Sequence, residues 1–111
     1  MLTNQEKKDY LLEILEAHGW RTLRFYPDDT RECYSCKKGK LGDVGLRIIP
    51  VYGCILIEFW IRDLCYAVDI PISNVEVNLD YIEFTYECIA MKIRLADGHV
   101  FMEYEPKEIE E

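Results

Sequence analysis

Apolar and polar residues alternate with the period of a β-strand in residues 91–105, on both sides of the pair Asp97-Gly98. Asp-Gly is a preferred pair for a two-residue type I′ turn, in which both central residues take positive φ. A turn at this pair places Leu95 opposite Val100 and fixes the register of a β-hairpin. Its apolar residues then share one face, which needs a cover: Met91, Ile93, Leu95, Val100, Met102 and Tyr104.

The opposite face of this hairpin carries charged and aromatic side chains. The same register places Lys92 opposite Glu103 and Arg94 opposite Phe101. We expect an ion pair and a cation–π contact there, each contributing at most about 1 kcal/mol at an exposed site. The hairpin is therefore predicted to meet the core with one face and water with the other.

The pattern near the start of the chain predicts an amphipathic helix over residues 4–18. Thr3 and Glu6 have the spacing of a capping box, in which each side chain accepts a hydrogen bond from the other residue's backbone N–H. Gly19 stands where a left-handed C-terminal cap belongs. We expect the helix to cover the hairpin's apolar face with the residues that recur at helical spacing: Leu11, Leu12, Ile14, Leu15 and His18.

Between helix and hairpin, strand-like segments alternate with turn signals. Residues 27–43 are polar and turn-rich and predict a long loop. The expected strands cover residues 20–26, 44–50, 54–62, 65–70 and 75–95. In the last of these the apolar positions change from even numbers at Ile82 and Phe84 to odd numbers at Met91. Residues 87–90 lack Gly, Pro, Asn and Asp, so we favour a β-bulge in one long bent strand over a tight turn.

Together these elements predict the α+β class. We expect one domain over residues 1–111, with the N-terminal helix packed on a mostly antiparallel sheet of about five to seven strands and a β-hairpin at the C-terminal end. The acidic tail 106–111 is expected to fray.

Charge is distributed unevenly along the chain. The formal net charge is −8; residues 1–43 carry eight basic and eight acidic residues, and residues 44–111 carry five and thirteen. A field of that sign repels nucleic-acid phosphates and attracts basic partners. The charge therefore disfavours direct nucleic-acid binding and favours a protein partner with a basic surface, although net acidity also serves solubility alone.

Composition and cysteine usage suggest a cytoplasmic protein. No apolar run approaches the roughly 20 residues of a membrane span, and the first residues have neither the basic nor the apolar region of an export signal. The five cysteines are an odd number, which speaks against a secreted disulfide framework.

Cys33 and Cys36 form a C-x-x-C motif in the expected loop, followed by lysines that favour thiolates. Such a pair can supply one edge of a tetrahedral zinc site, but no second pair of ligands at metal-binding spacing is present. The sequence leaves three interpretations open: a zinc site, a redox dithiol, and ordinary loop cysteines. No cofactor other than zinc is indicated.

Acidic residues on the polar faces of the last strands are candidates for partner binding: Glu76, Asp80, Glu83, Glu87, Glu103 and Glu105. Carboxylates spaced along a twisted sheet can imitate nucleic-acid phosphates and enter a basic cleft. Strand alternation alone also produces such a row on any solvated face. Acid–base or Mg²⁺ chemistry would further require converging carboxylates in a pocket.

By elimination, the sequence favours a small acidic protein-interaction module over an enzyme. It would act as an inhibitor or adaptor on a larger partner with a basic surface, for example one that handles nucleic acid. The alternatives are a zinc-stabilised or redox-responsive domain that uses Cys33 and Cys36, and a small enzyme or ligand-binding domain with a pocket between helix and sheet. An exposed edge strand would also permit self-association. Exposed aromatic side chains are further candidates for interface anchors: Tyr34, Tyr52, Trp60, Tyr66 and Tyr81.

Overall fold

The computed structural model describes residues 2–24, 32–39, 42–61 and 63–104, and this part of the chain confirms the α+β class. The helix α1 spans Asn4–Ala17, and short 3₁₀ helices span Pro50–Tyr52 and Ile72–Asn74. The first sheet contains β1 (Arg21–Arg24), β2 (Cys33–Lys38), β3 (Asp43–Ile49), β4 (Cys54–Ile61) and β5 (Leu64–Pro71). The second contains β6 (Glu76–Val77), β7 (Tyr81–Tyr86), β8 (Ile89–Arg94) and β9 (Val100–Tyr104).

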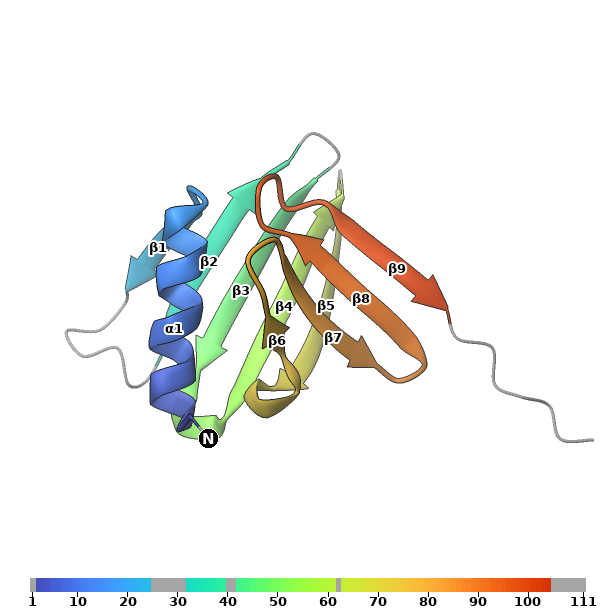
Figure 1. Cartoon of the computed structure of the whole chain (residues 1–111). Helices are drawn as coiled ribbons and strands as arrows, with labels where there is room; N and C mark the ends of the chain where they lie inside the picture. The colour runs from blue at the N-terminus through green and yellow to red at the C-terminus, as the bar shows by residue number, and fades with distance from the viewer. Residues whose placement is uncertain (1, 25–31, 40–41, 62, 105–111) are drawn as a thin grey trace, which may run out of the picture.

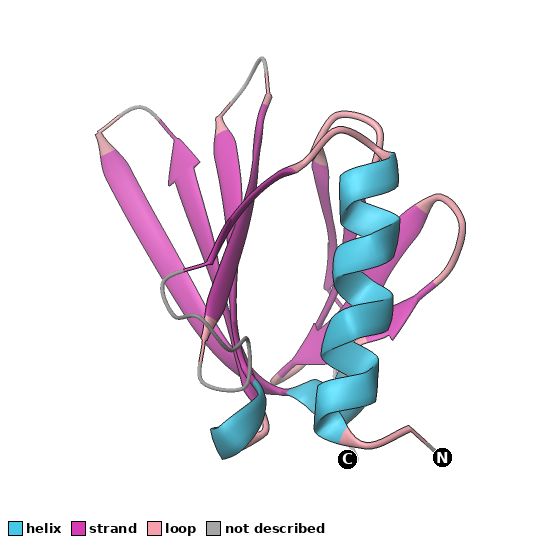
Figure 2. Cartoon of the chain, turned by 90° about the vertical axis from the view of Figure 1, so that its left-hand side faces the viewer, coloured by secondary structure: helices cyan, strands magenta, loops and turns pink. Residues whose placement is uncertain are grey.

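These elements form two layers (Figures 1 and 2). The five-stranded sheet, in the order β1-β2-β3-β4-β5, is one layer. The other layer holds α1 and the four-stranded sheet β6-β7-β8-β9 side by side. All strand pairs within each sheet are antiparallel. The prediction of a single sheet covered by the helix is therefore corrected: the five-stranded sheet is covered partly by α1 and partly by a second sheet.

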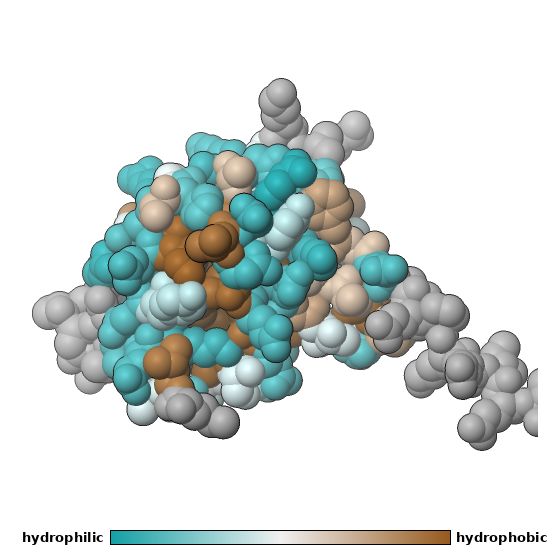
Figure 3. Space-filling view, in the orientation of Figure 1, coloured by the Kyte–Doolittle hydropathy of each residue, from teal (hydrophilic) through white to brown (hydrophobic). Residues whose placement is uncertain are grey.

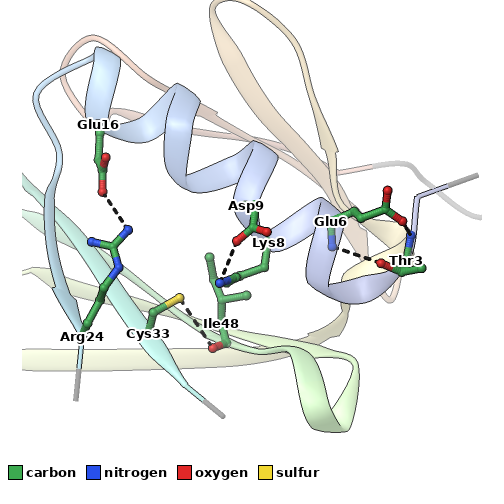
Figure 4. Close-up of polar contacts among 8 residues, drawn as sticks. All are labelled: Thr3, Glu6, Lys8, Asp9, Glu16, Arg24, Cys33 and Ile48. Carbon is green, nitrogen blue, oxygen red and sulfur yellow. Dashed lines mark hydrogen bonds and ion pairs between the residues drawn. The ribbon is translucent and has the colours of Figure 1, made fainter. Parts of the chain in front are cut away.

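Local hydrogen bonds fix the start of α1, and an ion pair between Glu16 and Arg24 joins the helix to β1 (Figure 4). The predicted capping box is present, with both Thr3–Glu6 distances at 3.1 Å, and Gly19 takes the expected positive φ of 81°. Lys37 Nζ donates to the carbonyl of His18 at 3.0 Å. The buried face of the helix consists of Lys8, Leu11, Leu12 and Leu15.

The main apolar core lies between the two layers. Every element of the sheets except β1, β6 and β9 contributes fully buried apolar residues, and fully burying one such side chain contributes about 1.5–3 kcal/mol. Trp20, directly before β1, links the five-stranded sheet to the other layer because its indole Nε1–H donates to the carbonyl of Leu95, just after β8, at 2.8 Å. The core comprises three leucines of α1 with Trp20, Cys33, Val44, Leu46, Ile48, Ile55, Ile57, Phe59, Ile70, Ile72, Val75, Ile82, Phe84, Met91, Ile93 and Leu95.

The expected loop over residues 27–43 contains a strand, β2, and that prediction was wrong for residues 33–38. Residues 25–31 and 40–41 lie outside the described part of the chain. β2 pairs with β1 on one side and with β3 on the other. Its buried positions are Cys33 and Ser35, whose small side chains give no visible hydrophobic alternation. Pairing on both edges therefore stabilises a strand that the residue pattern does not signal.

The phase change after Phe84 is a tight turn and not the favoured β-bulge. Tyr86 pairs with Ile89, which leaves a two-residue connection between β7 and β8. Glu87, in this connection, has a φ of 56°. Two-residue hairpins commonly require positive φ, and a non-glycine residue can take it at a modest cost. The absence of Gly or Asn at this position hid the turn.

The C-terminal hairpin is present, but its turn is longer than predicted and its register is shifted by two residues. Ile93 pairs with Val100, and of the two expected turn residues only Gly98 has positive φ, at 72°. Leu95 leaves the ladder and is fully buried, where its N–H donates to the carbonyl of Asp80 at 2.9 Å. A shift by two residues preserves which side chains share a face, so Met91, Ile93 and Leu95 are buried as predicted. Lys92 consequently pairs with Glu83 at 3.1 Å and not with Glu103 as predicted.

On the outer face of the five-stranded sheet, the ring of Tyr34 on β2 lies over Gly45 on β3. A Cβ at position 45 would sit 2.7 Å from Cζ of this ring. Arg47 stacks on the ring at 5.6 Å and forms ion pairs with Glu32 and Glu58. Burial and then the carboxylate of Glu58 raise the pKa of Tyr34 to about 12. Gly45 is therefore required because the tyrosine occupies the volume of a side chain there.

We predict that Gly45→Ala lowers the free energy of unfolding by about 1–3 kcal/mol, the usual cost of overpacking. In a Tyr34→Ala background the same change should instead stabilise the protein by up to about 1 kcal/mol, because alanine is favoured over glycine inside a strand. Urea unfolding of the four proteins measures this coupling. An equal cost in both backgrounds would contradict the steric explanation.

Candidate functional site: an apolar cleft between the two sheets

Burial of the inner faces of both sheets decreases toward one corner of the molecule. Along β5, Ile70 is 2% exposed and Tyr66 is 56% exposed. Across the core, burial is complete at Ile93 on β8, whereas Met102 on β9 is 62% exposed. The two sheets therefore diverge toward the corner where β5 and β9 lie, which is the same side of the molecule in Figure 1.

A cleft of about 870 Å³ occupies this corner. Its lining is mainly apolar and comes from both sheets, with polar groups and glycines at its rim. A cleft of this size and composition is typical of a site that receives an apolar ligand group. The walls are Val44, Phe59, Tyr66 and Val68 from the five-stranded sheet and Tyr86, Ile89, Met91, Val100 and Met102 from the four-stranded sheet; the rim is Gly39, Gly42, Asp43, Trp60, Asp97, Gly98 and His99.

The turn between β8 and β9 forms an ordered part of the rim. Asp97 accepts hydrogen bonds from Nε and Nη2 of Arg94, at 2.9 and 2.6 Å, and from the backbone N–H of His99 at 3.0 Å. The Arg94 guanidinium, followed by the His99 N–H, holds the pKa of the Asp97 carboxyl well below its usual range. These contacts favour the ionised form of the carboxylate and engage it within the turn.

The outer face of the four-stranded sheet combines aromatic rings with charges of both signs. Phe101 lies edge-on to Tyr81, with centroids 6.2 Å apart, and to His99 at 4.5 Å. Arg94 lies over the Phe101 ring at 5.3 Å, so the predicted cation–π contact is confirmed. Lys92 lies over the Tyr81 ring at 5.4 Å. This face of the molecule is mostly hydrophilic, with some hydrophobic side chains gathered beside α1 (Figure 3).

The structure brings together only some of the candidate acidic residues. Glu76 and Glu83 are direct partners on β6 and β7, and Glu83 is neutralised by Lys92. Asp80 lies in the turn between these strands, where its N–H donates to the Asn78 side chain at 2.9 Å. Glu87 lies in the turn between β7 and β8 and Glu103 is exposed on β9, whereas Glu105 lies outside the described residues.

Cys33 and Cys36 project to opposite faces of β2. Cys33 is fully buried in the core, where its thiol lies 4.0 Å from the carbonyl of Ile48, whereas Cys36 is partly exposed on the outer face. Residues three apart on a strand alternate in direction and are separated by roughly 10 Å. The strand therefore does not bring these two thiols together as one edge of a metal site. Within the four described ranges, no group of three or more His, Cys, Asp or Glu side chains has an arrangement that could hold a metal ion.

The other cysteines are distributed over strands and turns. Cys54, Cys65 and Cys88 are partly or fully exposed, and no disulfide joins any of the five cysteines. Burial, followed by the carboxylate of Asp69, raises the pKa of the Cys54 thiol, which makes it a weaker nucleophile at neutral pH.

Comparison with models of known protein families, with curated proteins and with solved structures gave no match. Among the described residues, no helix has the length and apolar character needed to cross a membrane.

The sequence revealed the apolar faces that line the cleft but not the cleft itself. Met91, Val100 and Met102 were expected to need a cover, and Tyr66 was a candidate interface anchor. Their juxtaposition depends on the angle between two sheets, for which a period-two pattern carries no signal. This cleft lies between the two sheets, whereas the ligand-binding alternative from the sequence was a pocket between helix and sheet.

We predict that a thiol reagent labels Cys65 rapidly in the native protein and labels Cys33 only as the protein unfolds. Cys65 is exposed on an edge strand, whereas Cys33 is fully buried. Peptide mapping by mass spectrometry after timed labelling measures both rates, with the denatured protein as the control in which all five cysteines react. Rapid labelling of Cys33, or a Cys33–Cys36 disulfide formed under native conditions, would contradict the placement of the two residues in a strand.

We also predict that the Asp97 carboxylate stabilises the turn above pH 4 and that this contribution is lost as the pH falls below about 4. The pKa of Asp97 is lower in the folded state than its ordinary value of about 4, so the unfolded chain binds the proton first. The difference in stability between wild type and Asp97→Asn should therefore shrink from pH 6 to pH 3 in urea unfolding. A difference that stays constant over this range would contradict the Arg94–Asp97 interaction.

Proposed function

We propose that this protein is a non-catalytic interaction module whose cleft receives an apolar segment of a protein partner. The observation that carries the proposal is the apolar cleft of about 870 Å³ that lies between two sheets and is flanked by their edge strands, β5 and β9. Exposed apolar surface of this kind, rimmed by polar residues, marks interaction sites in proteins.

Charge favours a basic partner. Residues 44–111, which supply nearly all of the cleft lining, hold five basic and thirteen acidic residues. Glu87, in the turn between β7 and β8, follows the lining residue Tyr86, and Glu103 on β9 follows the lining residue Met102, so two acidic residues neighbour the cleft lining in the sequence. Long-range attraction would speed the encounter with a cationic partner, and the apolar groups would provide affinity. An adaptor or inhibitor role in the cytoplasm, on a partner with a basic surface, is part of this proposal.

The proposal can be tested by selecting binders from a random 16-residue peptide library displayed on phage. We expect enriched peptides to contain several apolar residues flanked by Lys or Arg. Val68→Trp, which places a large side chain in the cleft, should weaken their binding about tenfold or more, equivalent to about 1.4 kcal/mol. Thr85→Trp, on the exposed outer face of β7, is the control of equal bulk and should leave binding unchanged. Circular dichroism verifies that both variants fold.

Two further measurements separate the apolar from the electrostatic contribution. Charge reversal by Glu87→Lys with Glu103→Lys should lower the association rate, and raising the salt concentration should have a similar effect in the wild type. Failure to enrich peptides, or binding that is insensitive to Val68→Trp, would refute the cleft as the site.

A second candidate function is the binding of a free apolar molecule, because the cleft volume lies within the range of small-molecule sites. A hydrophobic fluorescent dye such as bis-ANS would then bind the wild-type protein with a stoichiometry of one. It would bind the Val68→Trp variant much more weakly, because the tryptophan would occupy part of the cleft. The peptide selection would yield no cleft-directed sequence in this case.

A further inference from the structure

Within the described residues, β5 has no strand beside it on its outer edge, and this edge is long and weakly protected. β5 ends the five-stranded sheet and has eight residues, among which Asp69 carries the only charge. The opposite edge, β1, has four residues and includes Arg21 and Arg24. β6, at one edge of the four-stranded sheet, has two residues. Short or charged edges resist pairing with another strand, whereas a long edge without such protection accepts one.

The backbone of β5 offers a regular set of hydrogen-bonding groups to solvent. The N–H of Ile72 donates to the carbonyl of Gly53 at 2.8 Å, one step beyond the Cys54–Pro71 pair, so the pairs of β4 and β5 at even-numbered positions of β5, including Leu64, are of the hydrogen-bonded type. Every second residue after Leu64 therefore faces β4 with its N–H and C=O groups. The intervening residues Cys65, Ala67 and Asp69 direct theirs away from the sheet.

The side chains of β5 connect this edge to the cleft. Tyr66 and Val68 line the cleft, whereas Cys65, Ala67 and Asp69 lie on the outer face of the sheet. A strand added beside β5 would extend the five-stranded sheet opposite β9. Alternate side chains of that strand would point toward the cleft and the others would lie beside Asp69.

We propose that the partner segment binds as an extended strand, antiparallel to β5, with apolar side chains at alternate positions in the cleft and basic side chains at the intervening positions. This inference rests on the proposed function and specifies its binding mode. It accounts for two features: the outward backbone groups of β5, which have no strand partner among the described residues, and the exposure of Tyr66, at 56%, and Met102, at 62%, which line the cleft. Backbone hydrogen bonds supply affinity in this mode and alternate side chains supply specificity.

Charge distinguishes a basic partner strand from a second copy of this chain. Two copies would bring together two molecules that each carry a net charge of −8. A strand with Lys or Arg at alternate positions would instead meet Asp69 on the strand and the exposed Asp63 just before it. The occupant that fits is therefore a segment in which apolar and basic residues alternate.

The probe for the first test is a capped eight-residue peptide that alternates lysine and valine. Directly opposite residues in an antiparallel pair share a face, so the lysines would lie opposite Cys65, Ala67 and Asp69 and would direct their own N–H groups toward β5. N-methylation of the lysine backbone nitrogens should weaken binding about tenfold or more. N-methylation of the valine nitrogens, which point away from β5, is the matched control and should change affinity less than twofold. Isothermal titration calorimetry measures all three peptides.

Amide hydrogen exchange provides a second test that needs no variant. The amides of Cys65, Ala67 and Asp69 should exchange rapidly in the free protein and become at least tenfold more protected when the lysine–valine peptide is bound. The amides of Leu64, Tyr66 and Val68 face β4 and should be protected in both states. Native mass spectrometry of the free protein accompanies this experiment and should show a monomer.

The outcomes separate the binding mode from the proposed function. Strand addition would be overturned, and the cleft would remain the binding site, if binding of the peptides still depends on Val68 but two other results fail. These results are the preference between the two N-methylation patterns and the protection of the amides of Cys65, Ala67 and Asp69. A dimer in the free protein with these three amides already protected would assign β5 to a second copy and also overturn it. Absence of binding by the lysine–valine peptide would refute the alternating basic strand, whereas the library selection decides the proposed function independently.

Discussion

The inner face of the five-stranded sheet is too wide for one helix to cover, and the rest of the structure follows from this constraint. β3 and β4 carry its large, fully buried aliphatic side chains, including Ile48, Ile55 and Ile57. α1 covers the side of the sheet near β1, and the four-stranded sheet covers the other side. Because sheets twist, two packed sheets cannot remain in contact over their whole area. Here they separate at the corner formed by β5 and β9, and the separation leaves the apolar cleft.

The cleft and the edge strands beside it are both consequences of this divergence between the two sheets. A second sheet that followed the first to its end would have buried Tyr66 and Met102 and closed the cleft. Instead, both sheets end there in strands without a further partner in the described part of the chain. Two copies of this chain repel each other because each carries a net charge of −8. Such repulsion disfavours pairing between the exposed edge strands of two copies.

Features stabilised by local interactions could be predicted from the sequence. The Thr3–Glu6 capping box, the end of α1 at Gly19 and most of the strands depend on nearby residues, and they are present. β2 could not be predicted, because its buried positions hold a cysteine and a serine and its stability comes from strands on both sides. The turn at Glu87 was likewise unmarked, since the residue there is not one that favours positive φ.

The sequence by itself determined which side chains of each element would be apolar and share a face, because that information is contained in the periods of the helix and the strand. Even the shifted register of the last hairpin preserved those faces. Only the tertiary structure decided which faces would cover one another and where the cover would end. Long-range hydrogen bonds contribute to this: the carbonyl of Leu95 accepts from the Trp20 indole, and the N–H of Leu95 donates to the carbonyl of Asp80. They draw Leu95 into the core, lengthen the turn and set the position of β9, which forms one wall of the cleft.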